Sequence, residues 1–291
     1  MSLDTTAVLL TPMVLALTAR LGLSPLPFAL LAVWLANTAS LLLPVSNLTN
    51  LLAVQRLNLS TLAFAARMAL PELVAVLITV AYLALLYRRS LAGRYELPHP
   101  APAADPALFW ICAGACVALA PAVLLGAPPW AAAGPCAAAC VIAFAVRRGK
   151  DLTWSMLPWR IVIFTEGLFL LVTAITRHGG TRLLAHLLGH STLGTTALAG
   201  ATSNAVNNLP AYLAVETTVS PGHTTQLLAA LLGTDTGPLV LVWGSLATLL
   251  WRERCKARGL IITPARFALV GLGGVPLVLL GTWTALLATG T

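Results

Sequence analysis

The sequence predicts an all-α polytopic membrane protein with inverted repeats, re-entrant hairpins and broken helices. Its mean hydropathy is +0.89 and only 9% of its residues are charged, whereas charged residues make up about a quarter of an ordinary globular chain. Several apolar runs reach the roughly 20 residues that a membrane-crossing helix needs. Two of these runs are interrupted by polar residues, and the two interruptions repeat each other.

An offset of 198 residues superimposes the two interrupted runs without a gap from residue 4 to residue 54. It places Asn37-Thr38 on Asp235-Thr236 and Pro12 on Pro210. Paired apolar segments interrupted by Gly, Pro and polar residues are typical of secondary transporters, in which the substrate lies between two discontinuous helices. The repeat therefore predicts a transporter whose two halves each supply a broken helix.

Residues 1–87 are expected to form the remainder of the first repeat. Residues 6–20 are a short apolar hairpin arm, and residues 61–87 are an uninterrupted span. Between them, the long apolar run 26–54 is broken at Pro44 and the polar residues that follow it. Proline removes a backbone hydrogen bond, so a helix rarely continues through it unchanged.

Residues 107–291 are expected to form the second repeat, after a polar, Pro-rich cytoplasmic loop at 88–106. The segment 192–217 has polar residues at its centre and is too short for two full spans, so it predicts a re-entrant hairpin. The run 224–251 is the second broken helix. The remaining expected elements are spans at 107–125, 130–146, 161–175 and 265–288, and a short amphipathic piece at 182–190.

Basic residues lie mostly between the apolar runs, so the net charge of +8 indicates orientation in a membrane and no nucleic-acid partner is expected. Cytoplasmic loops are enriched in Lys and Arg. This rule places Arg20, the 88–106 loop and the basic residues of 147–150 and 252–258 on the cytoplasmic side. The arm before Arg20 then opens inward and the 192–217 hairpin opens outward, so the repeats are inverted. A multi-pass protein of the cell (inner) membrane, surrounded by lipid, is expected.

Polar side chains at the helix breaks and at the hairpin centre are the candidate site. Non-helical backbone at membrane depth occurs where it lines a cavity or is buried in protein. Helix N-termini at such breaks suit a polar or anionic ligand, although Ser, Thr and Asn also join helices structurally. The candidate substrate- or ion-binding residues are Ser46, Asn47, Thr49, Asn50, Ser203, Asn204, Asn207, Asn208, Asp235, Ser245 and Thr248.

Three acidic residues are candidates for proton coupling, because an ionisable group inside a membrane span is costly and usually functional. Asp235 lies within the second break and is the strongest, followed by Asp4 and Glu166. Each could instead have a structural role, and Asp235 could pair with a nearby basic residue. Glu72 and Arg67, five residues apart in one span, are expected to pair with each other.

Cysteines provide neither a disulfide framework nor a strong metal-site pattern. Cys112 with Cys116, and Cys136 with Cys140, are spaced to share helix faces, and thiolates suit soft metalloids. Cys also serves as a small apolar residue in Ala-rich helices, and this interpretation is favoured. No nucleophile–base spacing indicates an enzyme, and no cofactor or metal is expected.

Four segments together resemble a known family, the ArsB-type arsenical pump membrane proteins of the ion transporter superfamily. The segments are Leu3–Pro12, Asn37–Asn50, Asn207–Pro210 and Gly233–Trp251. The most specific part is Gly-Thr-Asp-Thr-Gly-Pro followed by Gly-Ser-Leu-Ala-Thr-Leu-Leu-Trp in the last segment. This run favours the arsenical-pump branch over the carboxylate carriers, whose hairpins usually carry Ser-Asn-Thr.

The resemblance implies export of arsenite or antimonite, or another small anion, by exchange with protons. It also implies a scaffold domain and a moving transport domain, a homodimer, and in some members a partner arsenical pump ATPase. Relative to the family, the sequence starts halfway through the first hairpin, which predicts a misassigned start or a truncated copy.

Two alternatives stay open from the sequence. One is a sodium-coupled carboxylate transporter or sodium/proton antiporter of the same superfamily. The other is a truncated membrane fragment that does not transport.

Overall fold

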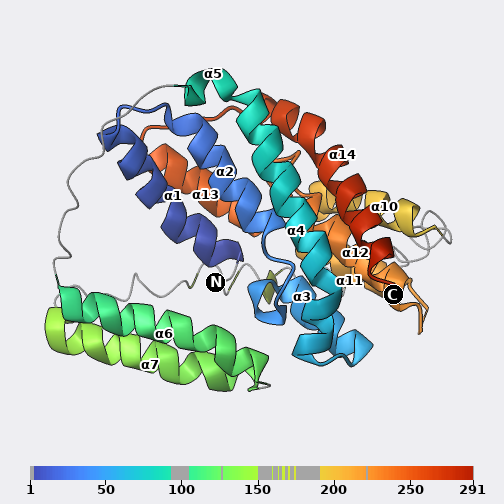
Figure 1. Cartoon of the computed structure of the whole chain (residues 1–291), viewed down its shortest axis with the longest axis horizontal. Coiled ribbons are helices and arrows are strands. Elements are labelled where there is room, and N and C mark those ends of the chain that lie inside the picture. Colours follow the sequence, from blue (N-terminus) through green and yellow to red (C-terminus); the bar gives the residue numbers. More distant parts are fainter. Residues whose placement is uncertain are drawn as a thin grey trace.

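The computed structural model describes residues 3–92, 105–125, 127–149, 191–220 and 222–290, with isolated positions between residues 159 and 174. Every regular element within these residues is helical, as the predicted fold class requires (Figure 1). The expected piece 182–190, most of the span 161–175 and much of the loop 88–106 lie outside the described residues.

The first part of the chain contains one broken helix and one long helix. Prolines and capping side chains mark the boundaries. Pro25 starts α2, Pro44 lies within the break after α2, and the Ser60 hydroxyl accepts the Ala63 amide to cap α4. The elements are α1 (Leu3–Arg20), α2 (Pro25–Thr38), the 3₁₀ turn η1 (Pro44–Ser46), α3 (Leu48–Leu57), α4 (Thr61–Leu86) and α5 (Arg88–Leu91).

The second part contains a helical pair, a hairpin, the second broken helix and a long final helix. Ser191, Ser245 and Thr263 cap α10, α13 and α14 by accepting backbone N–H groups. The elements are α6 (Pro106–Leu124), α7 (Pro129–Arg148), α10 (Thr192–Val206), α11 (Asn208–Glu216), α12 (Thr224–Thr236), α13 (Leu246–Ala257) and α14 (Pro264–Ala288).

The broken helices match at the offset found in the sequence. Shifting α2 and α3 by 198 residues carries them onto α12 and α13, and carries the break 39–47 onto the break 237–245. The residues that start the second halves also adopt the same extended backbone, with φ −146° at Asn47 and −140° at Ser245. Equivalent local sequences therefore break their helices at equivalent places.

Equivalent long helices run in opposite directions. Gly273 and Gly274 of α14 lie against Tyr82 near the end of α4, whereas Gly281 lies against Ile78, earlier in α4. The two helices are thus antiparallel where they pack side by side (Figure 1). Because the sequence offset relates them, their opposite directions agree with an inverted repeat.

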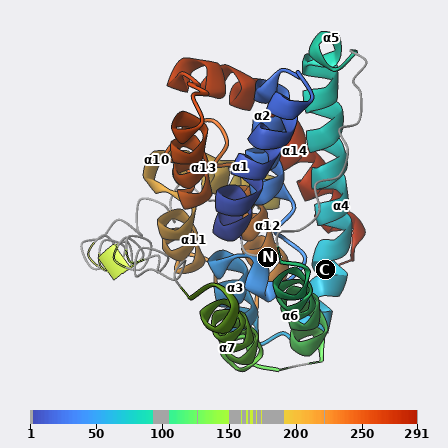
Figure 2. The same ribbon diagram turned by 90° about the vertical axis from the view of Figure 1, so that its left-hand side faces the viewer.

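Packing between the halves follows the same symmetry. Helix α1 packs on α2 of its own half and on α13 of the other, and Figures 1 and 2 both show these three helices together. The corresponding helix α11 packs on α12 of its own half and on α3 of the other. Each broken helix is therefore enclosed by elements of both halves.

Helices α10 and α11 fold back on each other around Asn207. This residue separates the two helices. Its backbone has φ 86°, a conformation that residues other than glycine rarely adopt. Ala199, eight residues before Asn207, and Val215, eight residues after it, share one buried cluster with Ala230 of α12. The two arms thus lie side by side, as the hairpin prediction requires.

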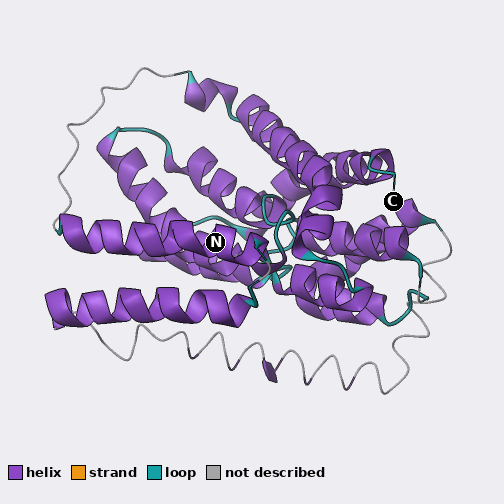
Figure 3. Cartoon of the chain, turned by 60° about the horizontal axis from the view of Figure 1, so that its bottom comes forward, coloured by secondary structure: helices purple, strands orange, loops and turns teal. Residues whose placement is uncertain are grey.

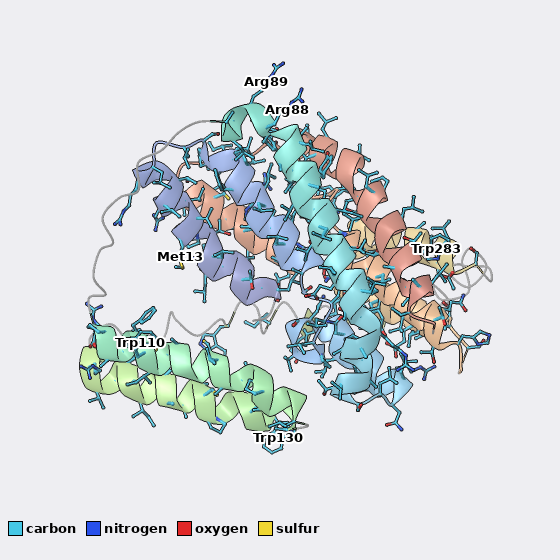
Figure 4. The ribbon with its side chains drawn as sticks, viewed as in Figure 1. Met13, Arg88, Arg89, Trp110, Trp130 and Trp283 are labelled. Carbon is cyan, nitrogen blue, oxygen red and sulfur yellow. The ribbon has the colours of Figure 1, made fainter. Side chains whose placement is uncertain are left out.

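Apolar side chains cover the outside of the molecule as well as its core. Met13, Trp110 and Trp130 lie at the outer surface (Figure 4), with exposed fractions of 67%, 71% and 78%. By length and composition, Thr61–Leu86, Trp130–Arg148 and Pro264–Ala288 can each cross a membrane. A surface of this kind is stable in lipid, which confirms the predicted polytopic membrane class.

Helices α6 and α7 form a pair that packs mainly on itself (Figures 1 and 2). The Arg147 guanidinium donates to the Asp105 carboxylate at 2.8 Å and holds the pKa of that exposed carboxyl below its ordinary value. Cys140 of α7 lies beside Cys112 of α6. All described cysteines are free thiols.

Close approach of α10 and α12 leads to a prediction about Gly233. A Cβ added there would collide with the Thr196 backbone carbonyl of α10, and backbone cannot move aside as a flexible side chain can. Gly233→Ala should lower the free energy of unfolding by about 1–3 kcal/mol, the usual range for overpacking. Thermal melting in detergent measures this effect. Gly134→Ala, whose Cβ meets nothing within 4 Å, is the control; equal melting of the two variants would contradict the packing.

Candidate functional site

The first break is held together by side chains of α3 and α4. Asn50 of α3 donates through Nδ2 to the Ser40 and Leu43 carbonyls at 2.7 and 3.0 Å. Glu72 of α4 accepts the Leu42 backbone N–H through its carboxylate. Peptide groups freed by the break are thus satisfied inside the protein, as a lipid environment demands.

Glu72 is a residue whose role the sequence did not reveal. The expected pair with Arg67 is wrong: Arg67 extends to the Ala63 carbonyl of its own helix, at 3.5 Å, while Glu72 reaches Leu42. A carboxylate inside an apolar span was the available signal. Its partner, however, lies thirty residues earlier in the chain, and the spacing within α4 says nothing about it.

The second break is held by the hairpin. Asn204 donates through Nδ2 to the Gly200 and Gly237 carbonyls at 2.9 and 2.8 Å. Its Oδ1 accepts the Val240 and Leu241 amides at 3.1 and 2.9 Å. An Asn side chain offers two donors and two acceptor lone pairs, so Asn204 uses its full capacity on the backbone.

The tip of the hairpin makes further contacts with the same break. Asn207 donates through Nδ2 to the Trp243 carbonyl at 3.0 Å, and the Asn208 backbone N–H donates to the Gly244 carbonyl at 2.8 Å. The Ser203 hydroxyl donates back to Gly200 at 2.7 Å. The hairpin amides thus position the break.

One hydrogen bond joins the two halves at their breaks. The Thr49 hydroxyl at the start of α3 donates to Asp235 Oδ1 in the last turn of α12, at 2.7 Å, and both residues are buried. Asp235 Oδ2 has no partner among the described residues. Figure 3 shows the non-helical segments gathered in the middle of the helical body, where these ends meet.

Several buried polar atoms near the breaks are unsatisfied by the described residues. Asn37 Oδ1, Asn47 Nδ2 and Asn50 Oδ1 have no hydrogen-bond partner there, like Asp235 Oδ2. Buried polar atoms are nearly always paired with protein, water or a ligand. This set contains acceptors and one amide donor, so a solute that both donates and accepts hydrogen bonds would match its chemistry.

The other predicted residues are placed less directly. Ser245 and Thr248 bond to each other at 2.9 Å at the start of α13, and Ser46 is buried in η1. Asp4 lies in the first turn of α1 with Oδ1 buried and unpaired. Glu166 is exposed, in a stretch of which only isolated positions are described, so its coupling role stays a prediction.

Comparison with known proteins identifies the family. A model of the citrate transporter family (CitMHS) matches residues 1–247. Arsenical pump membrane proteins of Escherichia coli, Yersinia enterocolitica and Shigella flexneri are 31%, 32% and 32% identical to the chain, each over 89% of it and 67% of the relative. The chain belongs to the ArsB-type arsenical pump membrane protein family. Both matches agree with the superfamily expected from the sequence, in which arsenical pumps and carboxylate carriers are grouped.

In this arsenical pump family member, Asn204 leads to a stability prediction. Asn204→Ala removes the donor to the Gly200 and Gly237 carbonyls and the acceptor of the Val240 and Leu241 amides, which are left unpaired. Each unpaired buried amide costs about 1–3 kcal/mol, so the variant should melt well below the parent protein. Gln55→Ala, at an exposed position of α3, should melt like the parent. A melting temperature unchanged by Asn204→Ala would contradict the bracing role.

Proposed function

We propose that the protein is a secondary transporter, or the greater part of one, that exports arsenite or antimonite in exchange for protons. The observation that carries the proposal is the buried Asp235. Thr49 of the other half bonds one of its oxygens, and the second oxygen has no partner among the described residues. The names of the relatives, arsenical pump membrane proteins, support the substrate class.

The chemistry of the breaks suits an uncharged hydroxylated solute. Arsenous acid carries hydroxyl groups that donate and accept hydrogen bonds, and the Asn37 and Asn50 oxygens with the Asn47 amide offer both kinds of partner. No Lys or Arg lies in residues 37–50 or 235–248. A multiply charged anion would leave its charge largely uncompensated there, which is costly in a buried site.

Asp235 is the coupling residue in this proposal. It is the sole carboxyl residue in the sequence of the two breaks, 37–50 and 235–248. Its free oxygen can hold a proton, or bind the substrate once that proton has left. Competition of proton and substrate for one carboxyl group is what an exchanger needs, because each then leaves as the other binds.

A second candidate function is transport of a carboxylate coupled to sodium, or sodium/proton exchange. The match to the citrate transporter family favours it, and so do the starts of α3 and α13 beside the breaks, since helix N-termini bind anions. The proposal has further parts. The family resemblance suggests a homodimer and a partner ATPase, and the positions of the basic residues suggest that their clusters face the cytoplasm.

Replacing Asp235 by Asn tests the proposal. Asn keeps the size and can accept the Thr49 hydrogen bond but does not titrate. Asp235→Asn should reduce arsenite accumulation driven by a proton gradient to background in everted membrane vesicles, with the protein still present and folded in the membrane. Asp105→Asn, which changes a surface carboxylate of the α6–α7 pair, is the matched control and should accumulate arsenite like the parent.

Three results separate the candidates. Proton-driven accumulation by Asp235→Asn at the parent's rate would remove Asp235 from coupling and leave Asp4 and Glu166. Sodium-driven uptake of labelled citrate, without arsenite accumulation, would favour the carboxylate carrier. No transport of either solute by folded parent protein would favour the truncated, non-transporting fragment.

A further inference from the structure

A line of unpaired polar atoms leads from Asp235 toward one end of the helical bundle. Asp235 Oδ2 is buried and has no hydrogen-bond partner among the described residues. The Tyr212 hydroxyl and Glu216 Oε2 are also buried, and the side chains of Tyr212 and Glu216 interact with each other. Tyr212 interacts electrostatically with both Asp235 and Glu216. Buried oxygens with so few partners cost free energy, which indicates that the group has a use other than stability.

Helix geometry places these atoms in order. Helices α3 and α11 pack together, and the first turn of each lies beside a break, where Thr49 bonds Asp235 and Asn208 bonds Gly244. Thr49 bonds Asp235, and Arg56, seven residues further along α3, lies 3.9 Å from Glu216 Oε1. With a rise of 1.5 Å per residue, Asp235 and Glu216 are separated by about 10 Å along the bundle.

Tyr212 lies between them. It precedes Glu216 by one turn of α11, on the same face of that helix and about 6 Å closer to the breaks along the axis. Exposure rises along the same line: Asp235 and Tyr212 are fully buried, whereas the Glu216 side chain is 17% exposed and that of Arg56 46%. Asp235, Tyr212, Glu216 and Arg56 thus follow one another from the interior of the protein to its surface.

We propose that Tyr212 and Glu216 form the path by which protons pass between Asp235 and the end of the bundle that carries Arg56. This inference rests on the proposed function, in which Asp235 carries the coupling proton. For release, the Tyr212 oxygen takes the proton of the Asp235 acid when the two side chains come within hydrogen-bond distance, while the Tyr212 hydroxyl proton passes to the Glu216 carboxylate. Asp235 is left ionised, Tyr212 unchanged and Glu216 neutral.

The surroundings then favour completion of the transfer. The charged or titratable neighbours of Tyr212 are Glu216, Asp235 and Arg56, and those of Glu216 are Arg56 and Tyr212. The Arg56 cation stabilises the Glu216 carboxylate, so Glu216 passes its proton on to water. Proton uptake follows the same steps in reverse.

A pH jump on the purified protein in lipid nanodiscs tests the path without any substrate. The infrared carbonyl band of protonated Asp235, identified by its absence in Asp235→Asn, reports the rate at which Asp235 exchanges its proton. Tyr212→Phe and Glu216→Gln should each slow this rate by at least about tenfold, equivalent to 1.4 kcal/mol of barrier, and should leave the size of the band unchanged. Tyr212→His, which restores a proton-carrying side chain, should recover the rate.

Matched substitutions elsewhere serve as controls. Tyr82→Phe removes the hydroxyl that bonds the Val270 carbonyl, and Glu253→Gln changes the surface partner of Lys256; neither should alter the exchange rate. Parent-like rates in Tyr212→Phe and Glu216→Gln would overturn the path. So would an Asp235 carbonyl band that does not change with pH, or one that disappears when sodium is added. Failure of the arsenite experiment alone would overturn the proposed substrate and leave the proton path standing.

Discussion

The structure depends on satisfying the peptide groups that two helix breaks leave free. In lipid, no water replaces a lost helical hydrogen bond, so each break must be surrounded by protein that supplies donors and acceptors. Asn204 meets this need with four hydrogen bonds at the second break. Asn50 and Glu72 meet it at the first. The positions of the hairpin and of α4 follow from this requirement.

The two halves solve the same backbone problem with different side chains. The offset of 198 residues places Leu42 on Val240, and both backbone N–H groups donate to a side-chain oxygen. At Val240 the acceptor is a neutral amide from the hairpin, whereas at Leu42 it is a carboxylate from α4. Backbone symmetry therefore does not extend to the charge of the acceptor.

The Thr49–Asp235 hydrogen bond connects the two breaks. It connects the start of one half-helix with the end of another across the repeat boundary, so a change in the charge of Asp235 acts on both halves together. The unpaired atoms of Asn37, Asn47 and Asn50 lie at the first break, while Asn204 and Asn207 are occupied with backbone at the second. Among the described residues, the unpaired amide atoms therefore lie mainly at the first break, and Asp235 lies at the second.

The sequence by itself determined the positions of the helices, of both breaks and of the hairpin, because apolar runs, prolines and small polar residues act on the backbone beside them. Residues 39–47 and 237–245 break the helices where the repeat predicts. Only the tertiary structure decided which polar side chains have all their hydrogen-bond partners and which keep unpaired atoms. Asn204 and Asn47 look alike in the sequence, yet one makes four hydrogen bonds and the other has an unpaired amide nitrogen. The partners of Asn204, Glu72 and Thr49 at the breaks lie 30 or more residues away, and a hydrogen bond over that separation depends on how the helices pack, which no local pattern records.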